Sequence, residues 1–196
     1  MKFIVGLTGP TGSGKSTACK AAADLGFFVI DCDKTARKAV EDKNCLDALV
    51  TAFGKDILNT DGSLNRKTLA QKAFSERQNT KLLNDTIFPF ILEILKSEIN
   101  GAKEDKILLD APTLFESGVD TFCNETCAIL ADSSIRLERI LKRDNLDEDA
   151  ANLRMSAGKD DQYYKEKTKH ILYNNNSEEQ IYKDFSKLLT SFVGGR

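Results

Sequence analysis

The sequence lacks a surplus of basic residues and any long apolar run. Lysine and arginine total 28 against 30 aspartate and glutamate residues, so no basic field attracts nucleic acid or an anionic membrane. No apolar stretch approaches the roughly 20 residues that a membrane helix needs. The first residues lead directly into an apolar segment, so we expect no signal peptide. These absences predict a cytoplasmic protein that binds neither nucleic acid nor membrane.

The cysteines and the single histidine do not form the pattern of a zinc site or a disulfide framework. The five cysteines are an odd number and lie mostly within apolar runs, which suits a reducing cytosol better than a disulfide framework. Cys123 and Cys127 are four apart, and His170 is the only histidine, so a zinc site is not expected. The thiols are better interpreted as small buried hydrophobic groups.

The order of apolar segments predicts a parallel sheet covered by helices. The 196 residues fit one domain and show no internal repeat or Pro/Ser linker. Helical patterns separate the expected strands, an alternation that favours helices on both faces of the sheet. The expected strands are residues 2–8, 27–31, 106–110, 126–131 and 170–173.

Two helical excursions interrupt this alternation. The interval 34–101 is too long for one crossover and predicts a substrate-binding subdomain, in which Pro89 kinks or restarts the third helix. Residues 145–169 are highly charged and predict a mobile lid. The helices expected in the insertion lie near 34–53, 66–76 and 79–100. Within the single domain 1–196, the core then comprises about 1–33, 102–144 and 170–196.

Residues 9–16 read GPTGSGKS and match the phosphate-loop pattern G-x-x-x-x-G-K-S/T. Its glycines permit positive φ and close backbone approach, so that backbone N–H groups and the following helix N-terminus cradle an anion. Lys15 would reach the β/γ-phosphates, and Ser16 would offer its hydroxyl to Mg²⁺. A short apolar strand precedes the loop and an Ala-rich helix follows it, as this motif requires. The expected ATP contacts here are Gly9, Thr11, Gly12, Ser13, Gly14, Lys15, Ser16 and Thr17.

Acidic residues follow several of the predicted strands, where open α/β sheets bind their ligands. Asp33 would orient an attacking hydroxyl and accept its proton, or simply cap the next helix. Asp31 would contact substrate or a metal-bound water, or form a turn. Asp110 ends an apolar strand of the Walker B kind, whose acid holds Mg²⁺. The candidate metal residues are therefore Ser16, Asp31 and Asp110.

Basic and amide side chains supply further candidates. Arg139 and Arg143 share a helix face with Arg136, and either would reach the ATP phosphates, although a solvated face is the competing interpretation. Arg66 would bind an anionic group of the substrate. Asn175, in the run 174–176, would meet the adenine edge or form part of a turn.

Signature strings narrow the class of phosphate-loop protein. The chain contains no N-K-x-D or D-x-x-G string of GTPases and no L-S-G-G-Q string of transporter ATPases. The predicted fold is a three-layer α/β/α domain of the P-loop NTPase type, with a five-stranded parallel sheet, a helical substrate-binding insertion and a helical lid. A small-molecule kinase fits this arrangement best.

The chain resembles the dephospho-CoA kinase family, which phosphorylates the 3′-hydroxyl of dephospho-CoA with ATP. The D-x-D and P-x-L-F-E elements, in this order, are more specific than the phosphate loop. The segments that carry the resemblance are residues 6–16, VIDCD at 29–33, DGSLNR at 61–66 with Leu69 and Phe74, LDAPTLFESG at 109–118, and Arg139 with KRD at 142–144.

The resemblance implies that Asp33 is the general base or orients the attacking hydroxyl. Together with the residues named above, the expected catalytic set is Asp33, Lys15, Arg139 and Arg143, with ATP and Mg²⁺ as cofactors. It implies that the arginine-bearing helix and the lid close over ATP. Phe88-Pro89 stands where the family has H-P, Gly158 where glutamine is usual, and Tyr173-Asn174-Asn175 where D-N-x is usual. The implied dephospho-CoA contacts are Asp31, Asp33, Arg66, Phe88, Pro112, Leu114 and Glu116.

We expect a monomer or a small homo-oligomer. The alternative functions are a nucleoside or nucleoside-monophosphate kinase on the same core, and a nucleotide-dependent binding switch that transfers no phosphate to a small molecule. An acceptor screen separates the two kinases, and slow hydrolysis without acceptor dependence would mark the switch.

Overall fold

Five short strands form one sheet in the order β2-β3-β1-β4-β5. The computed structural model describes residues 2–194. β1 pairs in parallel with both β3 and β4, and β4 pairs in parallel with β5, which confirms the expected parallel α/β fold. The strands are β1 (Phe3–Thr8), β2 (Phe28–Asp31), β3 (Lys106–Asp110), β4 (Glu125–Leu130) and β5 (His170–Tyr173).

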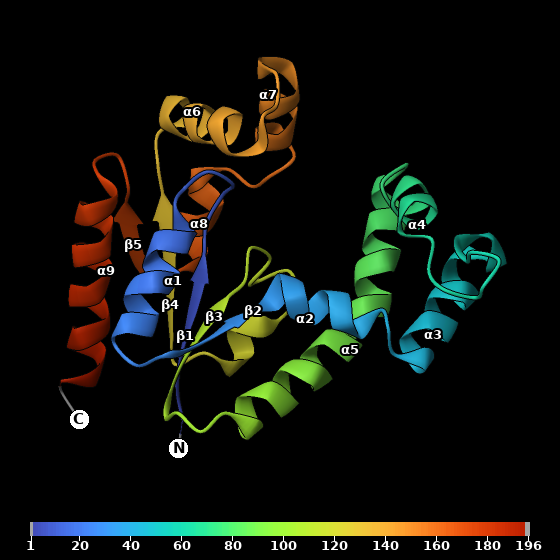
Figure 1. Cartoon of the computed structure of the whole chain (residues 1–196), viewed down its shortest axis with the longest axis horizontal. Helices are drawn as coiled ribbons and strands as arrows, with labels where there is room; N and C mark the ends of the chain where they lie inside the picture. Colours follow the sequence, from blue (N-terminus) through green and yellow to red (C-terminus); the bar gives the residue numbers. More distant parts are fainter. Residues whose placement is uncertain (1, 195–196) are drawn as a thin grey trace. The chain divides into compact units, whose positions relative to one another are not determined.

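The chain divides into two units, of which the first contains residues up to Ile30 and from Ala102 onward. Its helices are α1 (Lys15–Asp24), α6 (Ser133–Asp144), α7 (Glu148–Ser156), α8 (Asp161–Lys167) and α9 (Glu178–Val193), with 3₁₀ turn η2 (Val119–Phe122). α1 and α9 pack side by side over the sheet (Figure 1). The small alanines of α1 let it approach closely, while Phe185 and Leu189 of α9 fill the same core cluster.

The opposite face of the sheet is covered in part by α8. Tyr164 is 4% exposed and packs against Ala128 and Leu130 of β4. Cys127 and Ile129 alternate with these residues and belong to the α1/α9 cluster, as expected for a strand buried on both faces. The excursion 145–169 therefore contains two helices, α7 and α8, and α8 packs on the sheet.

The second unit, Asp31–Gly101, is helical and has its own core. Its helices are α2 (Cys32–Ala39), α3 (Lys43–Phe53), α4 (Arg66–Ala73) and α5 (Arg77–Gly101), with 3₁₀ turn η1 (Lys55–Ile57). The expected helix 34–53 is two helices, because the Asp42 carboxylate accepts from the N–H groups of Asn44 and Cys45 and so starts α3. α5 continues through Pro89, and its axis changes direction along its length (Figure 1).

Among residues 2–194, no helix is both long and apolar enough to cross a membrane.

Candidate active site

The loop between β1 and α1 has the backbone of an anion cradle. Gly9, Gly12 and Gly14 have φ values of 139°, 78° and 95°. Gly14 is the N-cap residue of α1 and has no side chain to bond the first helical N–H groups, so this helix end is open to an anion. The Lys15 ammonium donates to the Gly9 carbonyl oxygen at 2.8 Å. This bond keeps the positive charge of Lys15 against the backbone of the loop.

Neighbouring atoms also leave no space for a side chain at these three glycine positions. A Cβ on Gly9 would lie 2.2 Å from the backbone oxygen of Ile129 in β4. A Cβ on Gly12 would lie 2.8 Å from the Arg136 oxygen, and one on Gly14 would lie 2.1 Å from the Asn174 Nδ2 atom. The loop is thus packed tightly against β4, α6 and the segment after β5, all within the first unit.

Outward-facing carbonyls of the loop are bonded by side chains from outside it. Arg136 Nε donates to the Thr11 oxygen at 3.1 Å, and Asn174 Nδ2 donates to the Ser13 oxygen at 2.8 Å. Arg139 Nη1 makes longer bonds to the oxygens of Gly12 and Ser13, at 3.4 and 3.5 Å. In a trans peptide each N–H points opposite to the preceding carbonyl, so these bonds favour an inward orientation of the loop's N–H groups.

The arginines of α6 do not share one environment. Arg136, which we expected only as a member of the helix face, is buried at 6% exposure and was missed as a loop contact. Arg136 is the arginine of α6 closest in sequence to the end of β4, and this position was the signal that could have predicted the contact. Arg143 instead pairs with Asp144 through Nε and Nη2, both at 2.8 Å, and Arg154 of α7 bonds the same carboxylate at 2.8 Å.

This pairing perturbs both groups. The hydrogen bond from Arg143 lowers the pKa of Asp144, and the same bond raises the pKa of Arg143. The structure therefore places Arg139 at the phosphate loop and Arg143 at the junction of α6 and α7. The role of Arg143 at ATP stays a prediction.

The asparagines after β5 also differ from one another. Asn174 is buried, whereas Asn175 is exposed and its Oδ1 accepts from the backbone N–H of Asp132 at 2.9 Å. That bond ties the end of β5 to the start of α6. The expected adenine contact of Asn175 stays a prediction.

The end of β3 lies beside the end of β1. Asp110 is in register with Leu7, and the Ala111 N–H donates to the Leu7 oxygen at 2.9 Å. Thr8 Oγ1 donates to the Pro112 oxygen at 3.2 Å. Asp110 is the last residue of β3, as predicted, and β3 lies beside β1, which leads into the loop before the exposed Ser16 of α1.

The segment after β3 contacts α8. Leu114 is fully buried, so this expected substrate residue belongs to the core. Phe115 meets Tyr163 edge to face at 6.4 Å between ring centroids. Burial raises the pKa of Tyr163, and the nearby Glu116 carboxylate raises it further. The P-x-L-F-E segment therefore packs on α8 through Phe115 and contacts it through the hydrogen bond between Glu116 and Tyr163.

Within the second unit, Asp31 and Asp33 have different local roles. Asp31 caps α2 by accepting from the Lys34 N–H at 3.0 Å, so the interpretation of Asp33 as the cap is wrong. Asp33 is an exposed residue of the first turn. Arg66 begins α4 and is 3.8 Å from the Glu41 carboxylate, with both side chains mostly exposed. Phe88 is half-buried on α5.

A family model described as dephospho-CoA kinase matches residues 3–180. This chain belongs to the dephospho-CoA kinase family. The dephospho-CoA kinase of Fusobacterium nucleatum is 34% identical over 182 residues, covering 92% of this chain and 94% of that protein. The dephospho-CoA kinase of Corynebacterium glutamicum is 34% identical over 193 residues, covering 96% of each.

Solved structures agree with this membership. The dephospho-CoA kinase of Campylobacter jejuni is 27% identical, with a TM-score of 0.60 over 97% of each chain. A Thermus thermophilus protein of known crystal structure is also 27% identical, with a TM-score of 0.81 over 99% of this chain and 97% of that one. As a member of this kinase family, the chain is an ATP-dependent phosphotransferase.

The donor set near the loop fits Mg²⁺ carried by a nucleotide. Ser16 and Asp110 offer oxygen atoms only, the ligands that Mg²⁺ prefers. Among residues 2–194, no group of three or more His, Cys, Asp or Glu side chains could hold a metal ion by itself.

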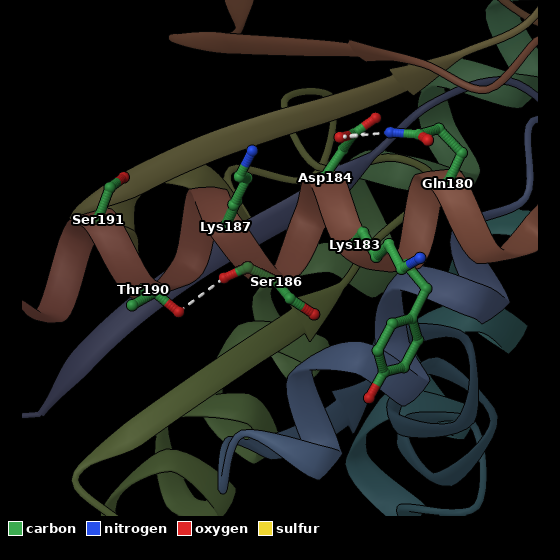
Figure 2. A pocket seen from close by; sticks show the side chains of 8 residues that line it. Gln180, Lys183, Asp184, Ser186, Lys187, Thr190 and Ser191 are labelled. Carbon is green, nitrogen blue, oxygen red and sulfur yellow. Dashed lines mark hydrogen bonds between the residues drawn. The ribbon is translucent and has the colours of Figure 1, made fainter.

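A separate pocket of about 680 Å³ lies along α9. Figure 2 shows two hydrogen bonds within the helix, from Gln180 to Asp184 at 2.9 Å and from Thr190 to the Ser186 carbonyl at 2.8 Å. Its lining contains no residue of the phosphate loop, so it does not mark the kinase site.

Proposed function

We propose that the chain transfers the γ-phosphate of ATP to the 3′-hydroxyl of the dephospho-CoA ribose, giving CoA and ADP in the last step of coenzyme A biosynthesis. The observation that carries this proposal is the family match over 3–180, a range that includes both the phosphate loop and the D-x-D segment. The backbone of the loop supports a phosphate ligand independently of that match.

On the donor side, the ATP phosphates occupy the loop. Lys15 and Arg139 neutralise charge on the transferring group, since both already lie against the loop backbone. Arg143 would exchange Asp144 for phosphate when the α6–α7 junction moves toward the nucleotide. The amide of Asn175 would meet the adenine.

Magnesium would be held by Ser16, assisted by Asp110 or Asp31. When bound, it would neutralise negative charge on the ATP phosphates. The oxygen-only donor set described above supports this assignment, and the chain's own residues then fix the nucleotide for in-line attack.

On the acceptor side, Asp33 holds the ribose hydroxyl and accepts its proton. A new O–P bond forms to the 3′-oxygen while the bond between the γ-phosphorus and the bridging oxygen breaks, and ADP leaves with that electron pair. Asp33 lies exposed in the first turn of α2, at the surface of its unit, and this position supports the role. Arg66 would bind anionic groups of dephospho-CoA.

The remaining acceptor contacts come from apolar and acidic residues. Phe88 and Pro112 would each make apolar contacts with dephospho-CoA, and Glu116 would make a polar contact with it. Leu114 would act by shaping the segment around it, since its own side chain is buried.

The five cysteines are free thiols, which supports a reducing, cytoplasmic location. We infer that the enzyme works there as a monomer or small homo-oligomer.

The proposed reaction is tested by ADP release from ATP in the presence and absence of dephospho-CoA. We expect ADP formation to depend on dephospho-CoA and the product to be CoA. Phosphorylation of a nucleoside or a nucleoside monophosphate, with none of dephospho-CoA, would overturn the proposal. ADP release that no acceptor accelerates would also overturn it.

A further inference from the structure

Asn174 has its polar groups committed to the protein. It follows β5, is 2% exposed, and its backbone N–H donates to the Leu130 oxygen of β4 at 2.8 Å. Its Nδ2 atom donates to the Ser13 oxygen at 2.8 Å. Its backbone oxygen and Oδ1 both accept from Arg139 Nη2, at 3.1 and 3.3 Å. The residue therefore links the sheet, the phosphate loop and the loop-facing arginine.

This geometry argues against base recognition by Asn174. An adenine edge needs an accessible amide, and the side chain offers almost no surface. The amide nitrogen of Asn174 also lies only 2.1 Å from the place that a Cβ on Gly14 would occupy. The glycine before Lys15 thus makes room for Asn174 as well as for a ligand.

We propose that Asn174 is a positioning residue for phosphate binding, which holds the Ser13 carbonyl outward and orients the Arg139 guanidinium at the loop. An asparagine suits this task because one amide supplies a donor to the carbonyl and an acceptor to the guanidinium. Alanine supplies neither, and aspartate lacks the donor. Arg139 alone makes only long bonds to the loop, at 3.4 and 3.5 Å, so its placement depends on a second partner.

The proposal distinguishes phosphate affinity from base selectivity. A positioning role predicts that loss of Asn174 weakens ATP, GTP and inorganic tripolyphosphate by the same factor, about 10-fold for the loss of a buried charge-assisted bond. A base-reading role predicts a changed ATP/GTP ratio and unchanged tripolyphosphate affinity. A merely structural role predicts a lower melting temperature with all three affinities unchanged.

The experiment is calorimetric titration of wild type, Asn174→Ala and the neighbouring control Asn176→Ala with the three ligands, alongside thermal unfolding. Asn176 is exposed and lies outside the proposed site. We expect equal weakening in N174A and wild-type affinities in N176A. An altered ATP/GTP ratio, or tripolyphosphate affinity equal to wild type, would refute the role. If N174A does not fold, the neutral N174S variant, which also lacks the amide, is titrated with the same three ligands.

The proposal rests on the assignment of the phosphate loop to ATP. These titrations contain no acceptor, so their outcome does not depend on dephospho-CoA. Failure of the wild type to bind tripolyphosphate or ATP would refute the loop assignment itself, whereas normal wild-type binding with an unaffected N174A would refute only the role of Asn174.

Discussion

Replacing Gly9 by alanine adds one Cβ atom at the first residue of the phosphate loop, close to the backbone of β4. The new Cβ would lie 2.2 Å from the Ile129 oxygen, against 3.4–4 Å for ordinary contact, so the backbone must shift by about 1 Å. Ile129 is fully buried in β4 and cannot withdraw. Positive φ costs alanine about 1–2 kcal/mol, and overpacking adds about 1–3 kcal/mol. We expect a loss of about 2–5 kcal/mol in the free energy of unfolding, and ATP affinity at least about 10-fold weaker.

Gly118→Ala is the matched control, because Gly118 has φ 74° but no atom within 4 Å of its Cβ position, and it lies in the same unit. It should lose only the 1–2 kcal/mol that positive φ costs an alanine, and it should bind ATP normally. Urea unfolding and nucleotide titration measure both quantities. Equal destabilisation of the two variants, with unchanged ATP affinity in G9A, would refute the close packing of the loop on β4.

Two further predictions concern a buried thiol and a buried guanidinium. Burial raises the pKa of Cys127 from 9.0 to about 12, so the unfolded thiol ionises first and stability is lost as pH rises. Between pH 8 and 10.5 this thiol should cost about 2 kcal/mol in urea unfolding. Cys127→Ala should show a correspondingly smaller loss, and identical pH slopes would contradict the assignment. Arg136→Lys should raise the KM for ATP about 10-fold, because lysine cannot keep the guanidinium bond to Thr11. An unchanged KM in steady-state kinetics would show that this bond does not support the loop.

Local signals predicted much of the fold. β3 and β5 have the predicted bounds, because a short run between polar turns leaves little choice of where the strand begins and ends. The loop at 9–16 was predictable because its glycines meet a local backbone requirement and Lys15 and Ser16 carry the side chains that the motif specifies. The division of 34–53 was missed because Asp42 competes with helix continuation only through its cap. Pro89 was compatible with either a kink or a restart, and the continuous α5 resolves that choice.

The contacts that brace the site were not predictable from local patterns. Arg136 and Asn174 reach the loop from positions 125 and 161 residues away from their partners. Helical spacing predicted that Arg136, Arg139 and Arg143 share one face. The packing of α6 decides that the first two contact the loop and the third does not. An asparagine run after a strand likewise fits a turn, a base contact or a brace. The pairing of β1 with β4 and of β4 with β5 brings Asn174 to Ser13.

The role of Asp33 as the partner of the attacking hydroxyl is the central claim, and acceptor-dependent turnover of Asp33→Asn tests it most directly. The control is Asp47→Asn, an exposed acid of the same unit outside the proposed site. We predict that D33N lowers kcat by roughly 10²–10⁴-fold while ATP affinity stays within about 2-fold of wild type, because only the proton acceptor is removed. D47N should match wild type in both. Near-normal turnover of D33N with dephospho-CoA would contradict the account.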